Sequence, residues 1–210
     1  GDGIIRTDLT GCVERWSLVG VRTSLRRCDA GKERPFPIAT TRDGQTIAVG
    51  RAGGGVDVWS DGGASPRTLA GPATVAGLAL AADGASLVVV EDGGTVHLLA
   101  LDTGASRVLA QPPLIDSWWH AVAITPDGRR VVWGDVGGQL GVHDRTDGTT
   151  RMIAGPGGEL RDAVVTPDGA TAISLDRTGT LVRWDLAGGP ATVLATYREA
   201  GRLVGSLDGA

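Results

Sequence analysis

Short apolar segments alternate along this chain with polar turns that are rich in glycine and aspartate. In the clearest unit, apolar strands are expected at 160–166, 172–175, 180–184 and 191–195. Strands this short, joined by turns of a few residues, favour antiparallel pairing in chain order. The pattern therefore predicts a four-stranded antiparallel meander in this unit.

The unit recurs at a nearly constant interval. Asp-Gly turns begin 40 to 44 residues apart, at Asp43, Asp83, Asp127, Asp168 and Asp208. A bulky anchor ends the third strand of each unit at a similar interval, at Trp16, Trp59, Leu99, His143 and Trp184. Four short strands per period of about 40–45 residues are the signature of a propeller blade. The sequence predicts an all-β fold, a β-propeller of four-stranded antiparallel blades with about five blades' worth of strands.

We expect one repeat domain over residues 1–210. Its repeats cover about 1–30, 31–70, 71–110, 111–154 and 155–195, with a partial repeat over 196–210. Eight residues after the turn aspartates stand Arg51, Glu91, Asp135 and Asp176. The acidic members are expected to accept hydrogen bonds from the loop backbone, and an acidic ring on one face is the alternative.

Three motifs carry a family resemblance. Pro-Asp-Gly turns stand at 126–128 and 167–169, and the run Gly-Thr-Leu-Val-Arg-Trp-Asp covers 179–185. With its repeats, the chain resembles the WD-repeat (tryptophan–aspartate) β-propeller family, in a diverged bacterial form, over nearly its whole length. It departs from that family where Gly-Pro replaces Gly-His, at Gly71-Pro72 and Gly155-Pro156. The family's buried Asp–His–Ser/Thr–Trp network is therefore expected to be missing.

The two ends of the sequence leave two arrangements open. The chain opens on a second-to-third-strand hairpin and closes on an inner strand at 202–206. The closing strand could complete the opening set in a five-bladed ring, or the chain could be an excerpt of a longer propeller. We favour the excerpt, because the sequence starts without methionine and five blades are uncommon among WD-repeat relatives.

Composition and motifs exclude several functions. The net charge of −4 and the pI of about 5.3 predict no nucleic-acid partner, since no chain-wide basic field exists. No apolar run is long enough for a membrane span, and nothing resembles a signal peptide, so a cytoplasmic location is expected by default. The only lysine, Lys32, lies outside any phosphate-binding loop, and no nucleophile elbow occurs. We expect no catalysis, no cofactor and no metal site.

Two cysteines and one histidine receive structural interpretations. Cys12 and Cys28 are too few for a disulfide framework or a zinc site, and Cys12 is expected to be a small buried thiol. His143 takes the place of an anchor tryptophan and is expected to be a packed core imidazole.

The segment that departs most from the repeat surrounds Trp118. It lies in an inserted loop that leads to an inner strand, and in the family such loops open on the face most used for partners. Trp118 is expected either to contact a partner or to pack against a blade, whereas Trp119 is expected in the core. His120 follows them, and Phe36 and Arg161 hold the equivalent place in their repeats. These four residues, Trp118, His120, Phe36 and Arg161, are the candidate partner-binding rim.

The first functional hypothesis is a non-catalytic scaffold that binds protein partners, as the sensor or docking module of a larger bacterial signalling protein. The resemblance implies a fused NTPase or kinase domain outside this segment. The alternative is a propeller enzyme or small-ligand binder, such as a lactonase-like hydrolase, with Asp162 and His120 as candidate groups near the axis. A degraded repeat array without a partner is the third possibility.

Overall fold

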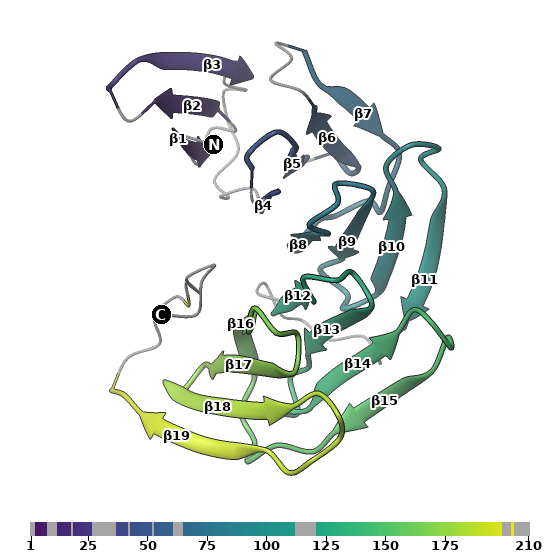
Figure 1. The fold of residues 1–210 in the computed structure, drawn as a ribbon, viewed down its shortest axis with the longest axis vertical. Helices are drawn as coiled ribbons and strands as arrows, with labels where there is room; N and C mark the ends of the chain where they lie inside the picture. Colours follow the sequence, from purple (N-terminus) through teal and green to yellow (C-terminus); the bar gives the residue numbers. More distant parts are fainter. Residues whose placement is uncertain are drawn as a thin grey trace.

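The computed structural model describes residues 3–7, 12–17, 19–26, 37–41, 43–51, 53–60, 65–111, 121–198 and 203. Within these ranges the chain is all-β and forms five antiparallel sheets whose strands pair in chain order (Figure 1). The first sheet has three strands, and each of the other four has four.

The strands of the five sheets have the following bounds. The first sheet contains β1 (Gly3–Thr7), β2 (Val13–Ser17) and β3 (Arg22–Arg26). The second contains β4 (Ile38–Thr40), β5 (Ile47–Gly50), β6 (Val56–Trp59) and β7 (Arg67–Leu69). The third contains β8 (Gly77–Leu80), β9 (Ser86–Val90), β10 (Val96–Ala100) and β11 (Ser106–Ala110). The fourth contains β12 (Val122–Ile124), β13 (Arg130–Gly134), β14 (Leu140–Asp144) and β15 (Thr150–Ile153). The fifth contains β16 (Leu160–Val165), β17 (Thr171–Asp176), β18 (Thr180–Asp185) and β19 (Thr192–Thr196).

The sheets are arranged side by side around a common centre (Figure 1). Strands β4, β8, β12 and β16 lie innermost, where successive inner strands contact one another, and β7, β11, β15 and β19 lie outermost. Sequential four-stranded meanders that stack radially define a β-propeller. The predicted fold class is therefore confirmed.

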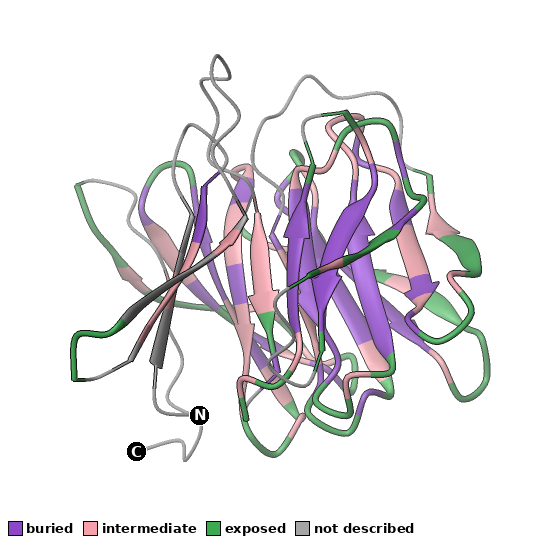
Figure 2. Cartoon of the chain, turned by 90° about the horizontal axis from the view of Figure 1, so that it is seen from above, coloured by how far each residue is buried: buried purple, intermediate pink, exposed green. Residues whose placement is uncertain are grey.

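The hydrophobic core lies between neighbouring blades. Val56 and Val58 of β6 pack against Leu87 of the next sheet, and Leu140 and Val142 of β14 pack against the blade that follows. Buried residues therefore run through the middle of the sheets, while exposed residues collect in the loops at both ends (Figure 2). Because both faces of the central sheets are covered, β9 is buried along its whole length.

The anchors that end the third strands differ in burial. Trp59, Leu99, His143 and Trp184 are buried, whereas Trp16 in the three-stranded sheet is half-buried and donates its indole N–H to Glu14 Oε2 at 3.2 Å. The indole Nε1 of Trp184 donates to Ser174 Oγ at 2.8 Å, within the core. Part of the hydrogen-bond network expected to be missing is therefore present, because Ser174 lies on the neighbouring strand two residues beyond Ala172, the residue opposite Trp184.

His143 stands where other blades have an anchor tryptophan, and its imidazole forms polar contacts both within its own blade and with the preceding blade. Its Nδ1 lies 2.8 Å from Thr150 Oγ1, and its Nε2 lies 3.3 Å from Nη2 of Arg107 on β11. A guanidinium can only donate, so Nε2 accepts and Nδ1 carries the proton. Burial, and then the charge of Arg107, lower the pKa of His143, which keeps the ring neutral.

The prediction that Cys12 is a free thiol is wrong. Cys12 is buried, at 7% exposure, but it is disulfide-bonded rather than a free thiol. The sequence has one other cysteine, Cys28. Pairing depends on the distance and direction between two Cβ atoms, which the spacing of two cysteines along a chain does not reveal.

Three of the Asp-Gly turns share a threonine two residues before the aspartate. The hydroxyls of Thr41, Thr125 and Thr166 donate to the carboxylates of Asp43, Asp127 and Asp168 at 2.6, 2.5 and 2.6 Å. Each hydroxyl also accepts the N–H of the residue five positions later, which begins or precedes the second strand. In the remaining described turn, which contains Asp83, alanine stands at position 81.

These bonds predict a specific loss of stability in acid. The hydroxyl bond, followed by a backbone N–H bond, lowers the pKa of Asp127 and Asp168 below the ordinary 3.8. A carboxylate with a lowered folded-state pKa stabilises the fold above its unfolded pKa, and this contribution is lost as pH falls through the folded value. Urea midpoints should therefore be flat above about pH 5 and fall below about pH 4. The double variant Thr125→Val/Thr166→Val should be less stable at neutral pH and show a shallower acid decline.

The control for this experiment is Thr103→Val. The Thr103 hydroxyl accepts the N–H of Ala105 at 3.2 Å, and it donates to no carboxylate within the described part of the chain. This variant should keep the wild-type pH profile. An unchanged acid decline in the double variant would show that other carboxylates, such as Asp144 and Asp147, whose pKa values are also lowered, dominate it.

Candidate functional site

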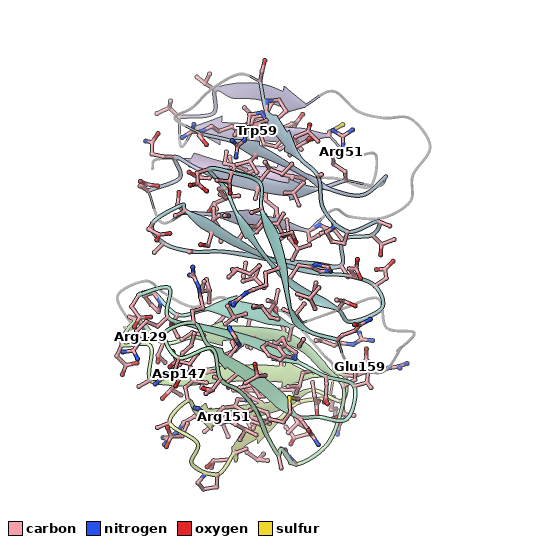
Figure 3. All side chains as sticks on the ribbon, turned by 90° about the vertical axis from the view of Figure 1, so that its right-hand side faces the viewer. Arg51, Trp59, Arg129, Asp147, Arg151 and Glu159 are labelled. Atoms are coloured by element: carbon pink, nitrogen blue, oxygen red, sulfur yellow. The ribbon has the colours of Figure 1, made fainter. Side chains whose placement is uncertain are left out.

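The loops of the propeller collect on two opposite faces. The entry face carries the loops that precede the inner strands and the turns between second and third strands. Arg51 and Glu159 lie on this face, and Arg129 and Asp147 lie on the opposite turn face (Figure 3). The candidate rim residue Arg161 is the second residue of the inner strand β16 and therefore lies near the entry face.

Loops of neighbouring blades are joined on the entry face. The N–H of Gly55 donates to the carbonyl of Pro72 in the next blade at 3.0 Å. The N–H of Leu160 donates to the carbonyl of Asp135 in the preceding blade at 3.1 Å. These bonds hold the loop before an inner strand against the turn of its neighbour, so the entry loops of the second and third blades, and those of the fourth and fifth, are joined.

Arg161 lies at a β-bulge on that surface. Pairing between β16 and β17 shifts register between Leu160 and Asp162, so Arg161 faces no partner residue on β17. Its side chain is partly buried, and its Nε is buried without a hydrogen-bond partner among the described residues. Bulges re-aim side chains and are common next to binding sites. The bulge therefore places a partly buried guanidinium, whose buried Nε has no hydrogen-bond partner in the part of the chain that the structure describes, near the start of an inner strand.

Asp162, the candidate group of the enzyme alternative, is engaged in backbone contacts. Its Oδ1 accepts the N–H of Ala163 at 3.0 Å, and its Oδ2 accepts the N–H of Leu203 at 2.9 Å. Both oxygens therefore hold the chain beside β16. Within the part of the chain that the structure describes, no cluster of three or more His, Cys, Asp or Glu side chains could hold a metal ion.

The other charged groups of the entry face are mixed in sign and largely paired. Oε2 of Glu159 lies 3.7 Å from Nη1 of Arg177. Nη1 of Arg51 lies 2.9 Å from Oδ1 of Asp57, whose side chain is buried. The carboxylate of Asp176 accepts the N–H groups of Thr178 and Thr180 at 2.8 Å. The carboxylate of Asp135 likewise accepts the N–H of Gln139 at 2.6 Å. These two acidic groups cap their own turns, as the sequence predicts.

Of the four predicted rim residues, Arg161 is the one that the structure places. Phe36, Trp118 and His120 lie outside the described residues, and so does Trp119. Whether they gather beside Arg161 stays a prediction. Among the described ranges, no helix is long and apolar enough to cross a membrane.

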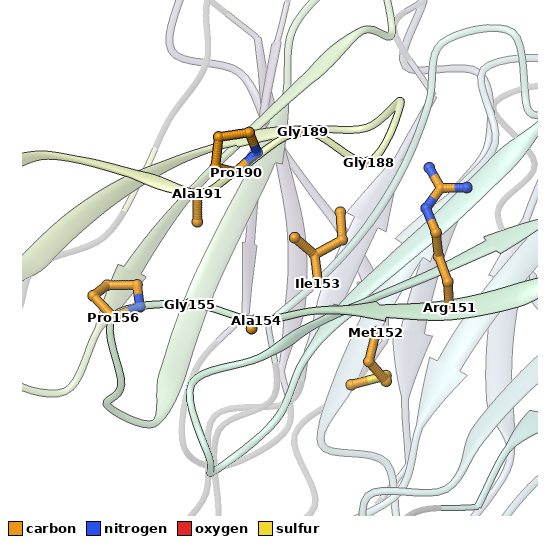
Figure 4. A pocket seen from close by; sticks show the side chains of 10 residues that line it. All are labelled: Arg151, Met152, Ile153, Ala154, Gly155, Pro156, Gly188, Gly189, Pro190 and Ala191. Carbon is orange, nitrogen blue, oxygen red and sulfur yellow. The ribbon is translucent and has the colours of Figure 1, made fainter.

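A cavity of about 560 Å³ opens on the outer side, between the fourth and fifth blades. Arg151 and Ile153 extend from β15 toward the loop 188–191, while Met152 points the other way (Figure 4). One guanidinium nitrogen of Arg151 donates to the carbonyl of Leu186. The remaining lining is small, apolar or glycine, so the cavity can receive a small group that bears a carboxylate against Arg151.

Arg151 is one of three arginines that sequence reasoning missed. Arg67, Arg107 and Arg151 take equivalent places on β7, β11 and β15, and each bonds to the next blade. Arg67 donates to the carbonyl of Asp102 at 2.9 Å, and Arg107 contacts His143. Their spacing of 40 and 44 residues matches the interval of the anchors, and this was the signal that could have revealed them.

Comparison with known proteins supports the fold. No protein-family model matches the chain, and no curated protein matches it. Among solved structures, the crystal structure of TolB from Acinetobacter baumannii, a β-propeller, matches with a TM-score of 0.68 over 93% of this chain. The identity is 14%, and the chain spans 54% of the TolB chain. The protein is a β-propeller, and at this identity the likeness extends to the fold alone.

Proposed function

We propose that this chain is a non-catalytic protein-interaction module that binds a protein partner on its entry face. The observation that carries the proposal is the bulge at Arg161, which places a partly buried guanidinium on the entry face, where the loops of the fourth and fifth blades are joined. Arginine is enriched at interface hot spots, since it combines an apolar stem with forked donors. A partner carboxylate is a suitable acceptor for this group.

Repeat equivalence extends the site beyond Arg161. Phe36 and His120 hold the same place in their repeats, and Trp118 precedes His120 in the longest repeat. Aromatic side chains beside an arginine are the usual composition of an interface centre. We propose that these residues complete the partner-binding rim.

We also propose the family and the cellular role of the protein. The Pro-Asp-Gly turns and the run at 179–185 support a diverged WD-repeat propeller of bacterial origin. A role as sensor or docking module of a larger signalling protein follows from that resemblance. The cytoplasm stays the prediction from the sequence, whereas the disulfide at Cys12 favours an oxidising compartment, because disulfides rarely persist in reducing cytosol.

The test is capture of partners from an extract of the host cell, quantified by mass spectrometry. Arg161→Ala and Trp118→Ala/His120→Ala should each reduce recovery of the specific partner about tenfold, equal to about 1.4 kcal/mol. Their melting temperatures should stay at the wild-type value. The matched control is Arg129→Ala, which removes an arginine from the turn face and should leave capture unchanged.

Two outcomes would contradict the proposal. Equal capture by wild type and both entry-face variants would place the partner elsewhere. Unfolding of the Trp118→Ala/His120→Ala variant would show that these residues belong to the core.

A further inference from the structure

The outermost strand of the last described blade, β19, has one free edge. The sheet order is β16-β17-β18-β19, so among the described strands β19 pairs with β18 alone. The pairing continues past Thr196, because the N–H of Tyr197 donates to the carbonyl of Gly179 at 2.9 Å. A register shift leaves Leu194 opposite no residue of β18. The free edge of a strand presents unpaired N–H and C=O groups that can pair with another strand.

The other outer strands differ from β19 in charge. Arginine is present in each of them: Arg22 and Arg26 in β3, Arg67 in β7, Arg107 in β11 and Arg151 in β15. β19 reads Thr-Val-Leu-Ala-Thr and carries no charge. Charged residues on edge strands oppose pairing between molecules, and this protection is missing from β19.

The side chains of β19 also favour association. Val193 is 48% exposed, Leu194 49% and the adjoining Tyr197 58%. Valine, threonine and tyrosine have high β-propensity. An uncharged segment of this composition without proline is suited to pairing with another β-strand.

The occupant that fits this edge is a second copy of the same strand. Antiparallel self-pairing centred on Leu194 places Val193 opposite Ala195 and Thr192 opposite Thr196. Apolar side chains then meet apolar ones, and threonines meet threonines. The next charged residue, Arg198, falls beyond the paired segment. We propose that two copies of this chain associate through antiparallel pairing of β19, which joins their last blades into one sheet across a two-fold axis.

The proposal is independent of partner binding on the entry face, and sedimentation velocity on the 210-residue chain tests it. From about 1 to 100 μM, the wild type should shift from monomer to dimer with a micromolar dissociation constant. Leu194→Lys should raise that constant at least about tenfold, because two charges would meet at the centre of the pair. Its melting temperature, measured below the dissociation constant, should equal that of the wild type.

The matched control is Met152→Lys. Met152 is 46% exposed on β15, an outer strand that already contains arginine, so the added charge should leave the dimer intact. Amide hydrogen exchange across 192–197 should slow in the dimer. A wild type that stays monomeric at 100 μM would overturn the proposal. A Leu194→Lys dimer of undiminished affinity, or equal dissociation by Met152→Lys, would also overturn it.

Discussion

Replacing Trp184 by alanine is expected to lower the free energy of unfolding by about 3–5 kcal/mol, the usual cost of truncating a buried tryptophan. Trp184 is fully buried in the cluster between the fourth and fifth blades, where it packs with Leu140 and Leu186. Truncation of its side chain leaves a cavity between the two blades and removes the hydrogen bond to Ser174 Oγ. Urea denaturation followed by circular dichroism measures the loss.

Two further variants separate packing from hydrogen bonding. Trp184→Phe keeps an aromatic ring but leaves the buried Ser174 hydroxyl without its donor, which costs about 1–3 kcal/mol. Adding Ser174→Ala should recover part of that loss, because the unsatisfied group is then gone. The comparison residue is Trp16, which is half-buried and should lose much less stability on truncation. A loss below about 1 kcal/mol in Trp184→Ala would contradict the packing assigned to this blade contact.

The second large effect is expected at Gly138, between β13 and β14. This glycine has a φ of +76°, and an added Cβ would lie 2.6 Å from the carbonyl carbon of Gly157 and 2.8 Å from the nitrogen of Gly158. These are backbone atoms of the next blade's entry loop, so the clash cannot be relieved by a change of side-chain rotamer. Gly138→Ala should therefore cost about 2–5 kcal/mol, the sum of a left-handed backbone penalty and overpacking.

Gly148 is the matched control because its φ is nearly the same, at +74°, and an added Cβ would meet nothing within 4 Å. Gly148→Ala should cost about 1–2 kcal/mol from the backbone conformation alone. The difference between the two variants then measures the contact between blades. Equal losses would show that the entry loop moves away from Gly138 at little cost.

The features predicted well from sequence are local ones. A turn such as 166–171 depends on a threonine, an aspartate and a glycine within six residues, and alternation of apolar residues depends on nearest neighbours. Both recur at the blade interval, so the propeller could be predicted. The threonine belongs to the same local pattern, since it accompanies three of the four described turns.

The features that escaped prediction join different repeats. The bond of Arg67 to Asp102 and the contact of Arg107 with His143 cross a blade boundary. Periodicity locates a residue within its own repeat but does not identify its partner in the next one. For the same reason, periodicity does not show whether the four candidate rim residues lie close together, since they come from separate repeats.

By itself, the sequence determined the all-β class, the meander of each blade, the turn positions and the anchors, because turn chemistry and side-chain alternation act over a few residues. The tertiary structure decided which groups face one another across the blades. It produced the bulge at Arg161, the backbone bonds of Asp162 and the free edge of β19. The bulge and the edge depend on strand register and strand order within the fifth sheet, and the bond of Asp162 to Leu203 joins residues 41 positions apart.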